Sequence, residues 1–417
     1  MRTRPMLLLL LGLASCAGLA RGQTLEQVQQ EAQASNPAVA AAEQAWHASE
    51  ERVVQEGWWP NPRLKLSLLN LPAGDLAFDR TPMSGKQIMV TQRAPFWRAP
   101  LKAARARARA RAAYQAWQDQ RWQVRQEVTR GYHDLAYLQR AETILKKNLG
   151  LLQRLVKVAR VKYERGAGLE QDVLRAEVES TLLENQLLEI GQKLDSGRAK
   201  LNALLGRPPD DRLVIESRDD WQARPLEAEV LRRRGRENNA RLKLLEALAE
   251  SARLSRRLAD ADWIPDLELS GYYTAREVVS GDPLEGEGFV GAAIGIEVPL
   301  WFFSHELPAA REAKARWEGA EKALEDWRGR LDAEVSDSHA KLERLAASAD
   351  LYARKVLPQA KATLDSSLTA YQTGRVEFLT LISNETMLVM HELDYYRILA
   401  EYESEIGRLE ALTSTAL

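Results

Sequence analysis

The sequence contains a single cysteine, Cys16, among its 417 residues. A disulfide within the chain and a thiolate metal cluster within one subunit are therefore excluded. Histidine is also scarce, and no two histidines have the close spacing that zinc ligands on one helix need, so we predict no metal site. The five histidines are His47, His133, His305, His339 and His391.

The sequence also lacks an excess of charge of either sign, with 58 lysines and arginines against 59 aspartates and glutamates. Nothing in this balance calls for a nucleic-acid partner, and the arginines at every second position from Arg105 to Arg111 would be scattered around a helix as a solvated basic collar. No phosphate-binding glycine loop or nucleophile elbow is present. We therefore expect no enzymatic activity and no cofactor.

Long hydrophobic runs are missing as well. The longest, Met6 to Ala14, is too short to span a bilayer as a helix, and it follows Arg2 and Arg4 as in an export signal. We predict a signal peptide over residues 1–22. Two processing sites compete: Leu13-Ala14-Ser15-Cys16 resembles a lipoprotein signal that would end at residue 15 and leave Cys16 lipidated, whereas Ala20-Arg21-Gly22 resembles an ordinary cleavage site.

Proline is absent between Pro100 and Pro208, and after Pro308 only Pro358 occurs. These gaps predict very long helices, because proline interrupts a helix interior. From Leu101 to about Tyr163, apolar residues recur at spacings of three, four and seven, as in coiled coils. A helix of about 65 residues would be on the order of 100 Å long, far more than a compact domain requires.

Two segments rich in proline, glycine and β-branched residues predict β-strands. Apolar and polar residues alternate along four stretches, 63–69, 87–93, 266–274 and 289–299. Such alternation over seven to eleven residues is what strands of a membrane barrel need.

The sequence repeats itself. Tyr163-Glu164-Arg165-Gly166 matches Tyr371-Gln372-Thr373-Gly374 at an offset of 208 residues, and leucine positions on both sides follow the same offset. We predict two structural repeats, 23–215 and 216–417, each with a helix, two strands, a very long helix and a returning helix. The fold class is mainly α with a small β part.

Four strands cannot close a membrane barrel alone, and open sheet edges are not tolerated in lipid. Subunits must therefore share one barrel. Three chains would form a twelve-stranded transmembrane β-barrel in contact with lipid, continued by a helical tunnel.

These features resemble the TolC-like outer membrane factor family over essentially everything after the signal. The resemblance rests on the paired Tyr-x-x-Gly turns, on Leu357-Pro358-Gln359-Ala360 before the second turn, on Trp59-Pro60-Asn61-Pro62 before the first strand, and on Val298-Pro299-Leu300 after the last. It implies a homotrimer in the bacterial outer membrane with a large periplasmic tunnel. Its partners would be a periplasmic adaptor (membrane fusion) protein and a proton-driven inner-membrane pump.

The resemblance also implies roles for individual residues. Residues of the two turns would lie at the periplasmic tip and dock the adaptor; they are Tyr163, Gly166, Gly168, Tyr371 and Gly374. Helix reversal needs residues tolerant of positive φ, which the three glycines provide. Family members often close the tip with acidic rings six positions after the turn glycine. That position holds Asp172 in the first half and Thr380 in the second, where Glu377 is the nearest carboxylate. A solvated helix-start aspartate is the alternative for Asp172.

We therefore predict a passive outer-membrane exit duct of a tripartite efflux system. The chain length and the Trp-Trp-Pro-Asn-Pro stretch resemble the heavy-metal efflux branch, which would make metal cations the substrate. Drug efflux and type I secretion use the same kind of tunnel and remain alternatives. A periplasmic coiled-coil scaffold would explain the helices but not the strands and the export signal.

Overall fold

The computed structural model describes residues 22–216 and 221–417. The predicted signal peptide, with Cys16, lies outside the described residues apart from Gly22. Within the described part, no helix combines the length and the apolar character needed to cross a membrane.

The described elements occur in the same order in both halves of the chain. The first half contains α1 (Leu25–Ser35), α2 (Pro37–Gly57), β1 (Arg63–Leu69), β2 (Gly85–Ala94), α3 (Arg98–Glu164) and α4 (Glu170–Leu204). The second half contains α5 (Ala228–Asn238), α6 (Ala240–Asp260), β3 (Leu267–Ala275), β4 (Phe289–Ile296), α7 (Glu306–Leu351), the π-helix η1 (Tyr352–Val356), α8 (Leu357–Gln372) and α9 (Phe378–Thr413). The predicted internal repeat and mainly helical fold are confirmed.

The chain divides into two compact units that each draw on both halves. We call one the helical unit; it consists of the described residues within Met1–Asn36, Val124–Pro225 and Lys341–Gly407. We call the other the sheet unit; it consists of Pro37–Gln123, Leu226–Ala340 and Arg408–Leu417.

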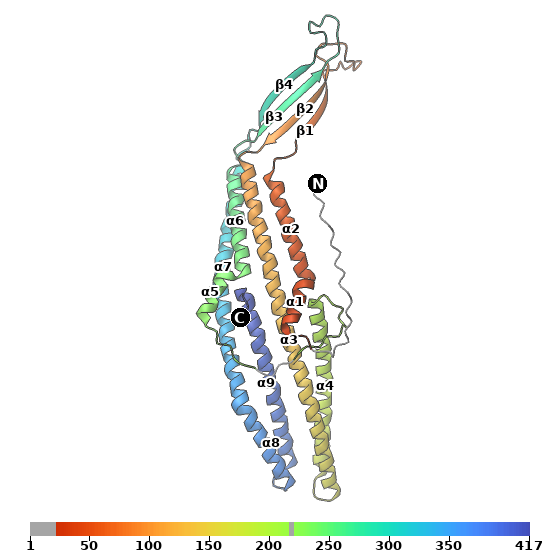
Figure 1. Cartoon of the computed structure of the whole chain (residues 1–417), viewed down its shortest axis with the longest axis vertical. Helices are drawn as coiled ribbons and strands as arrows, with labels where there is room; N and C mark the ends of the chain where they lie inside the picture. The colour runs from red at the N-terminus through yellow and green to blue at the C-terminus, as the bar shows by residue number, and fades with distance from the viewer. Residues whose placement is uncertain (1–21, 217–220) are drawn as a thin grey trace. The chain divides into compact units, whose positions relative to one another are not determined.

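The sheet unit contains one antiparallel sheet with the order β1-β2-β3-β4 (Figure 1). The central pair β2 and β3 joins the two halves of the chain, with Val90 opposite Gly271. β1 spans the predicted residues, and β2 extends slightly beyond them. β4 ends at Ile296 and not at Pro299, because its last partner is Leu267, the first residue of β3.

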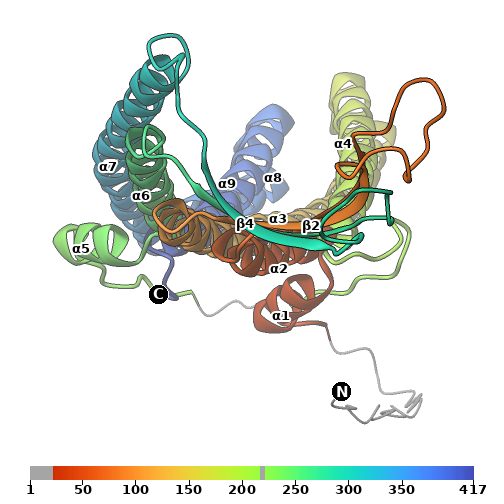
Figure 2. The same cartoon turned by 90° about the horizontal axis from the view of Figure 1, so that it is seen from above.

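The helices of the sheet unit pack through small and aliphatic side chains. Ala112 of α3 is buried with Leu244 and Ala247 of α6, and α6 lies beside α7 (Figure 2). Asn239 caps α6 by accepting a hydrogen bond from the Leu242 N–H at 2.7 Å, and its amide donates to the Leu412 carbonyl at 2.9 Å. One asparagine thus fixes both the start of α6 and the end of α9.

The helical unit contains the equivalent asparagine contact. The Asn36 amide donates to the carbonyl of Leu204 at 2.9 Å. Leu204 and Leu412 are 208 residues apart, which is the offset of the sequence repeat. Both halves therefore close the end of the returning helix with the same contact.

The two halves differ where the second contains Pro358. There α7 gives way to the π-helix η1, and α8 begins directly after it. Pro358 has no N–H to donate and its ring clashes with the preceding turn, so the helix widens locally. The equivalent position in the first half is Gly150, and α3 continues through it without a break.

Candidate functional site: two helix turns and an open sheet

The first turn of the helical unit, residues 165–169, connects α3 to α4. Gly166 has a φ of +68°, its N–H donates to the Tyr163 carbonyl, and the Ala167 N–H donates to the Lys162 carbonyl, both at 2.8 Å. This pair of bonds is a Schellman motif, which needs a left-handed residue and so favours glycine.

The second turn, residues 373–377, connects α8 to α9 in the same way. Gly374 has a φ of +73°, its N–H donates to the Tyr371 carbonyl at 3.2 Å, and the Arg375 N–H donates to the Ala370 carbonyl at 2.8 Å. The duplicated sequence motif therefore produces a duplicated backbone structure.

Gly168 does not have the conformation that we predicted for it. Its φ is not positive. A Cβ atom at this position would instead lie 3.0 Å from the Lys162 Cβ and 3.2 Å from the Tyr163 nitrogen. At Gly168 the chain lies close to the end of α3, and an added Cβ would be crowded there. The second turn has Val376 at the equivalent position.

The paired tyrosines differ in burial. Tyr163 is 45% exposed, whereas Tyr371 is 6% exposed. Lys162, from the end of α3, donates to the Tyr371 carbonyl at 3.0 Å and places its ammonium group 3.8 Å from the ring centroid of Tyr371. The first hairpin thus contacts the end of α8, directly before the second turn.

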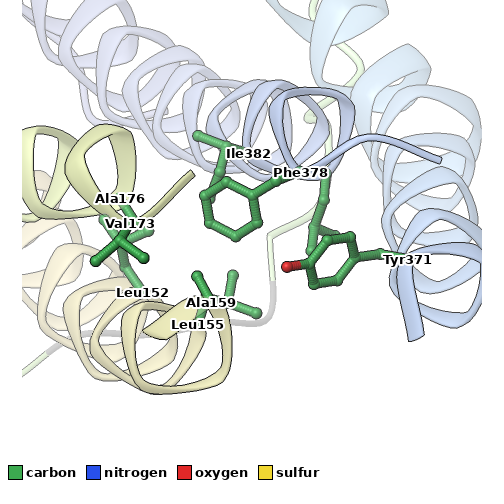
Figure 3. Packing of buried hydrophobic residues seen from close by; sticks show 9 residues of the cluster. Leu152, Leu155, Ala159, Val173, Ala176, Tyr371, Phe378 and Ile382 are labelled. Atoms are coloured by element: carbon green, nitrogen blue, oxygen red, sulfur yellow. The ribbon is translucent and has the colours of Figure 1, made fainter. Parts of the chain in front are cut away.

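A buried cluster joins the two hairpins, α3 with α4 and α8 with α9, next to the turns (Figure 3). Phe378 and Ile382 of α9 point toward the side chains of the first hairpin, and the Tyr371 ring lies beside Phe378 at 5.4 Å between centroids. The members from α3 and α4 are Leu152, Leu155, Ala159, Val173 and Ala176, and those of the second hairpin are Tyr371, Phe378, Leu381 and Ile382.

The two predicted gate residues occupy different environments. Asp172 is the third residue of α4 and is half-buried. Burial and the nearby Asp172 carboxylate raise the pKa of the Tyr371 hydroxyl. Glu377 directly precedes α9, is exposed, and its carbonyl accepts a hydrogen bond from the Thr380 N–H at 3.1 Å. The carboxylates are therefore not equivalent between the two turns.

A third carboxyl group, which was not predicted from the sequence, lies in the same unit. Glu385 of α9 is only 2% exposed, and burial, followed by repulsion from Glu179, raises its pKa to about 7. Its equivalent at the 208-residue offset is Glu177, which pairs with Arg160 at 2.5 Å. The available signal was that Arg160 has Leu368 as its own equivalent, so the second carboxyl group lacks the matching cation.

The sheet has one apolar face, and that face is exposed. Rows of paired residues, such as Leu66, Ile88, Tyr273 and Val290, run across all four strands. The exposed fractions reach 71% at Leu66 and 82% at Val290. The other large apolar residues of this face are Leu64, Leu68, Val90, Leu267, Leu269, Ile294 and Ile296.

The opposite face of the sheet is polar. Arg93 of β2 donates to Glu268 of β3 at 3.2 Å and lies 3.6 Å from Glu297, just after β4. Thr91 and Ser270 share a hydrogen bond of 2.9 Å. The predicted division into an apolar and a polar face is confirmed.

The loop between β3 and β4 is built around an ion pair that the sequence did not indicate. Arg276 and Asp282 are 3.2 Å apart, with side chains only 3% exposed each. The backbone N–H groups of Gly286 and Leu284, followed by Arg276, lower the pKa of Asp282. The pair orders this loop.

Comparison with known proteins places the chain in a family. The profile of the outer membrane efflux protein family matches residues 28–207 and 231–388. No curated protein matches the sequence.

Solved structures of outer-membrane channels resemble the fold. The outer membrane protein VceC of Vibrio cholerae aligns with a TM-score of 0.77 and 17% identity over 94% of this chain and 96% of its own. CusC, whose structures concern folding and transmembrane channel formation, aligns with a TM-score of 0.77 and 15% identity over 93% and 91%. The open state of the Neisseria gonorrhoeae MtrE channel aligns with a TM-score of 0.76 and 15% identity over 94% of this chain and 89% of its own. At these identities the likeness establishes the fold.

Proposed function

Because the chain belongs to the outer membrane efflux protein family, we propose that it is one subunit of a trimeric exit duct through the bacterial outer membrane. The observation that carries this proposal is the four-stranded sheet. Its apolar face is exposed, and in the described residues β1 pairs only with β2 and β4 only with β3.

The exposed apolar face and the open edges at β1 and β4 both require further copies of the same chain. Edge strands with free N–H and C=O groups must be paired in lipid, and an even-stranded closed barrel does this. Three copies joined from β4 of one to β1 of the next would give twelve strands, with the apolar face toward lipid and the Arg93, Glu268 and Glu297 face toward water. The chain would then conduct passively and catalyse nothing.

In this proposal the helical unit forms the periplasmic part. The two turns would dock an adaptor protein that links the duct to an inner-membrane pump driven by protons. The matching backbone of the turns supports a docking surface with two similar turns per chain, presented through Tyr163, Gly166, Gly168 and Gly374. Tyr371 is buried and would support its turn from within the cluster. The two repeats would meet between residues 215 and 216, and Cys16 would either be lipidated or be removed with the signal.

The gate of the duct would involve Asp172 with Glu377 as a second acidic position. Threefold symmetry brings three copies of Asp172 near one axis, where negative charge favours cations. We expect Asp172→Asn to change single-channel conductance or to reduce cation preference, and Glu377→Gln to have a smaller effect because Glu377 is exposed. A channel unchanged by Asp172→Asn would remove Asp172 from the gate.

Metal cations are the substrate class that the resemblance to the heavy-metal efflux branch favours. Drug efflux and type I secretion are the alternatives, and the pump selects among them because a wide water-filled tunnel discriminates weakly. Resistance of a deletion strain to metal salts and to drugs, each with and without the complementing gene, separates these substrate classes.

The direct test is planar-bilayer conductance of the detergent-extracted protein, with the oligomer mass determined in the same preparation. Discrete channels from a trimer are the expected result. A soluble, non-conducting species would contradict the duct and favour a periplasmic scaffold.

A further inference from the structure

Glu385 occupies a position in the helical unit that an apolar residue would normally take. It follows Leu381 by four residues and Ile382 by three, so all three side chains lie on one face of α9. Leu381 and Ile382 belong to the buried cluster between the hairpins. Glu385 therefore extends that cluster along the seam between α4 and α9.

The buried carboxyl group has an oxygen without a hydrogen-bond partner among the described residues. Its Oε1 atom accepts no hydrogen bond from any described residue. An ionised carboxylate is costly to bury without a hydrogen bond or a cation. Among the described residues, Glu179 of α4 raises the pKa of Glu385 further by repulsion.

Among the described residues, the cations near this seam are exposed or lie beside carboxylates other than Glu385. Arg175 of α4 lies 3.8 Å from Glu179, with 53% of the arginine side chain exposed. On α3, Arg160 pairs with Glu177, and Lys157 is exposed.

In the part of the chain that the structure describes, the contact of α8 with α9 beside Glu385 is between neutral groups. The Asn384 amide, next to Glu385 in α9, donates to the neutral Ser367 hydroxyl at 2.6 Å. The charged residues of α8 are Lys361 and Asp365, and both are exposed.

We propose that Glu385 and Glu179 form a proton-binding carboxyl pair, and that one bound proton holds α9 against α4. A protonated Glu385 is neutral and is compatible with the apolar seam, whereas two ionised carboxylates facing each other repel. Since α4 and α9 belong to different hairpins, release of the proton weakens the packing between the hairpins. This site does not depend on the proposed duct.

The direction of the pH effect follows from the raised pKa. A folded-state pKa of about 7, above the ordinary 4.5, means that the folded protein holds the proton more tightly than the unfolded chain. The stabilising effect of the proton is complete below pH 4.5 and is lost as the pH rises through about 7. The seam should therefore open more readily at pH 8 than at pH 5.5.

The test compares the wild type with Glu385→Gln, which keeps the side-chain shape and cannot ionise. Hydrogen exchange of α4 and α9 amides is measured on the full chain in detergent, with both proteins at the same pH. At pH 8, we expect wild-type amides of the seam to exchange on the order of tenfold faster, relative to Glu385→Gln, than at pH 5.5. A ratio that is the same at both pH values would overturn the proposal.

Two further variants make the result specific. Glu177→Gln is the matched control, since the equivalent carboxylate is half-exposed and paired with Arg160, and it should give the same ratio at both pH values. Glu179→Gln leaves Glu385 in place and should move the wild-type transition to lower pH. A transition that does not move would remove Glu179 and overturn the pair.

Discussion

The hairpins α3 with α4 and α8 with α9 share one turn structure but differ in what surrounds it. Gly166 and Gly374 have nearly the same φ and the same two backbone bonds. Around them, Tyr163 is exposed and Tyr371 is buried, and Glu177 pairs with Arg160 whereas Glu385 pairs with no cation among the described residues. The two halves share the backbone motif. Because of the differences in burial and charge, the stability of the second hairpin depends more on the first hairpin than the reverse.

The largest expected difference between the hairpins concerns the tyrosines. Tyr371→Ala removes a buried ring from the cluster and should cost about 3 kcal/mol of local stability. Tyr163→Ala, at the equivalent exposed position, should change stability by less than about 1 kcal/mol. Hydrogen exchange of amides near the turns measures both changes in stability. Equal changes in the two variants would contradict the difference between the hairpins.

The turn glycines should behave alike. Gly374→Val and Gly166→Val place a β-branched residue at positive φ and should each cost about 1–3 kcal/mol, since neither site crowds an added Cβ. The measurement is the apparent thermal midpoint in detergent. As the control, Gly150→Ala lies within α3 with open space around it and should stabilise by about 0.5 kcal/mol. A large difference between the two valine variants would contradict the shared turn motif. A destabilising Gly150→Ala would mean that the control does not separate the turn positions from an ordinary helix position.

The contact of Lys162 with Tyr371 should give a smaller effect. Lys162→Met keeps the aliphatic stem but removes the donor to the Tyr371 carbonyl and the cation over the ring, for a cost of about 1 kcal/mol. Protection of the second turn should fall while that of the first turn changes little. Lys157→Met, at an exposed position of the same helix, is the control. An equal effect of this variant would mean that the contact of Lys162 with Tyr371 does not stabilise the second turn.

Much of the fold could be predicted because it depends on local periodicity. The two-residue alternation of Leu64, Leu66 and Leu68 identified β1, and the lack of proline after Pro100 identified α3. The element boundaries depended on partners: β4 stops at Ile296 because β3 begins at Leu267. The π-helix before Pro358 was not predicted, since proline signals a break but not its form.

The candidate site was less predictable for the same reason. Gly166 and Gly374 follow from turn chemistry, which is local. Gly168 was assigned a positive φ that it does not have, because a close approach to Lys162 cannot be seen in the sequence. The missing cation of Glu385 could be read from Leu368 at the position equivalent to Arg160. The burial of Glu385 depends on the packing of α9 against the first hairpin, which becomes visible only when the helices are placed side by side.

In the proposed barrel, β4 of one subunit pairs with β1 of the next, and cysteine cross-linking tests this pairing. Ser67 of β1 is replaced by cysteine together with Gly291, Ala293 or Gly295 of β4, in separate double variants. Single cysteine variants of β4 show whether Cys16 contributes to cross-linking. We expect at least one pair to give an oxidant-dependent trimer on a non-reducing gel. Only monomers from every pair, with the protein extracted from the outer membrane, would contradict the shared barrel.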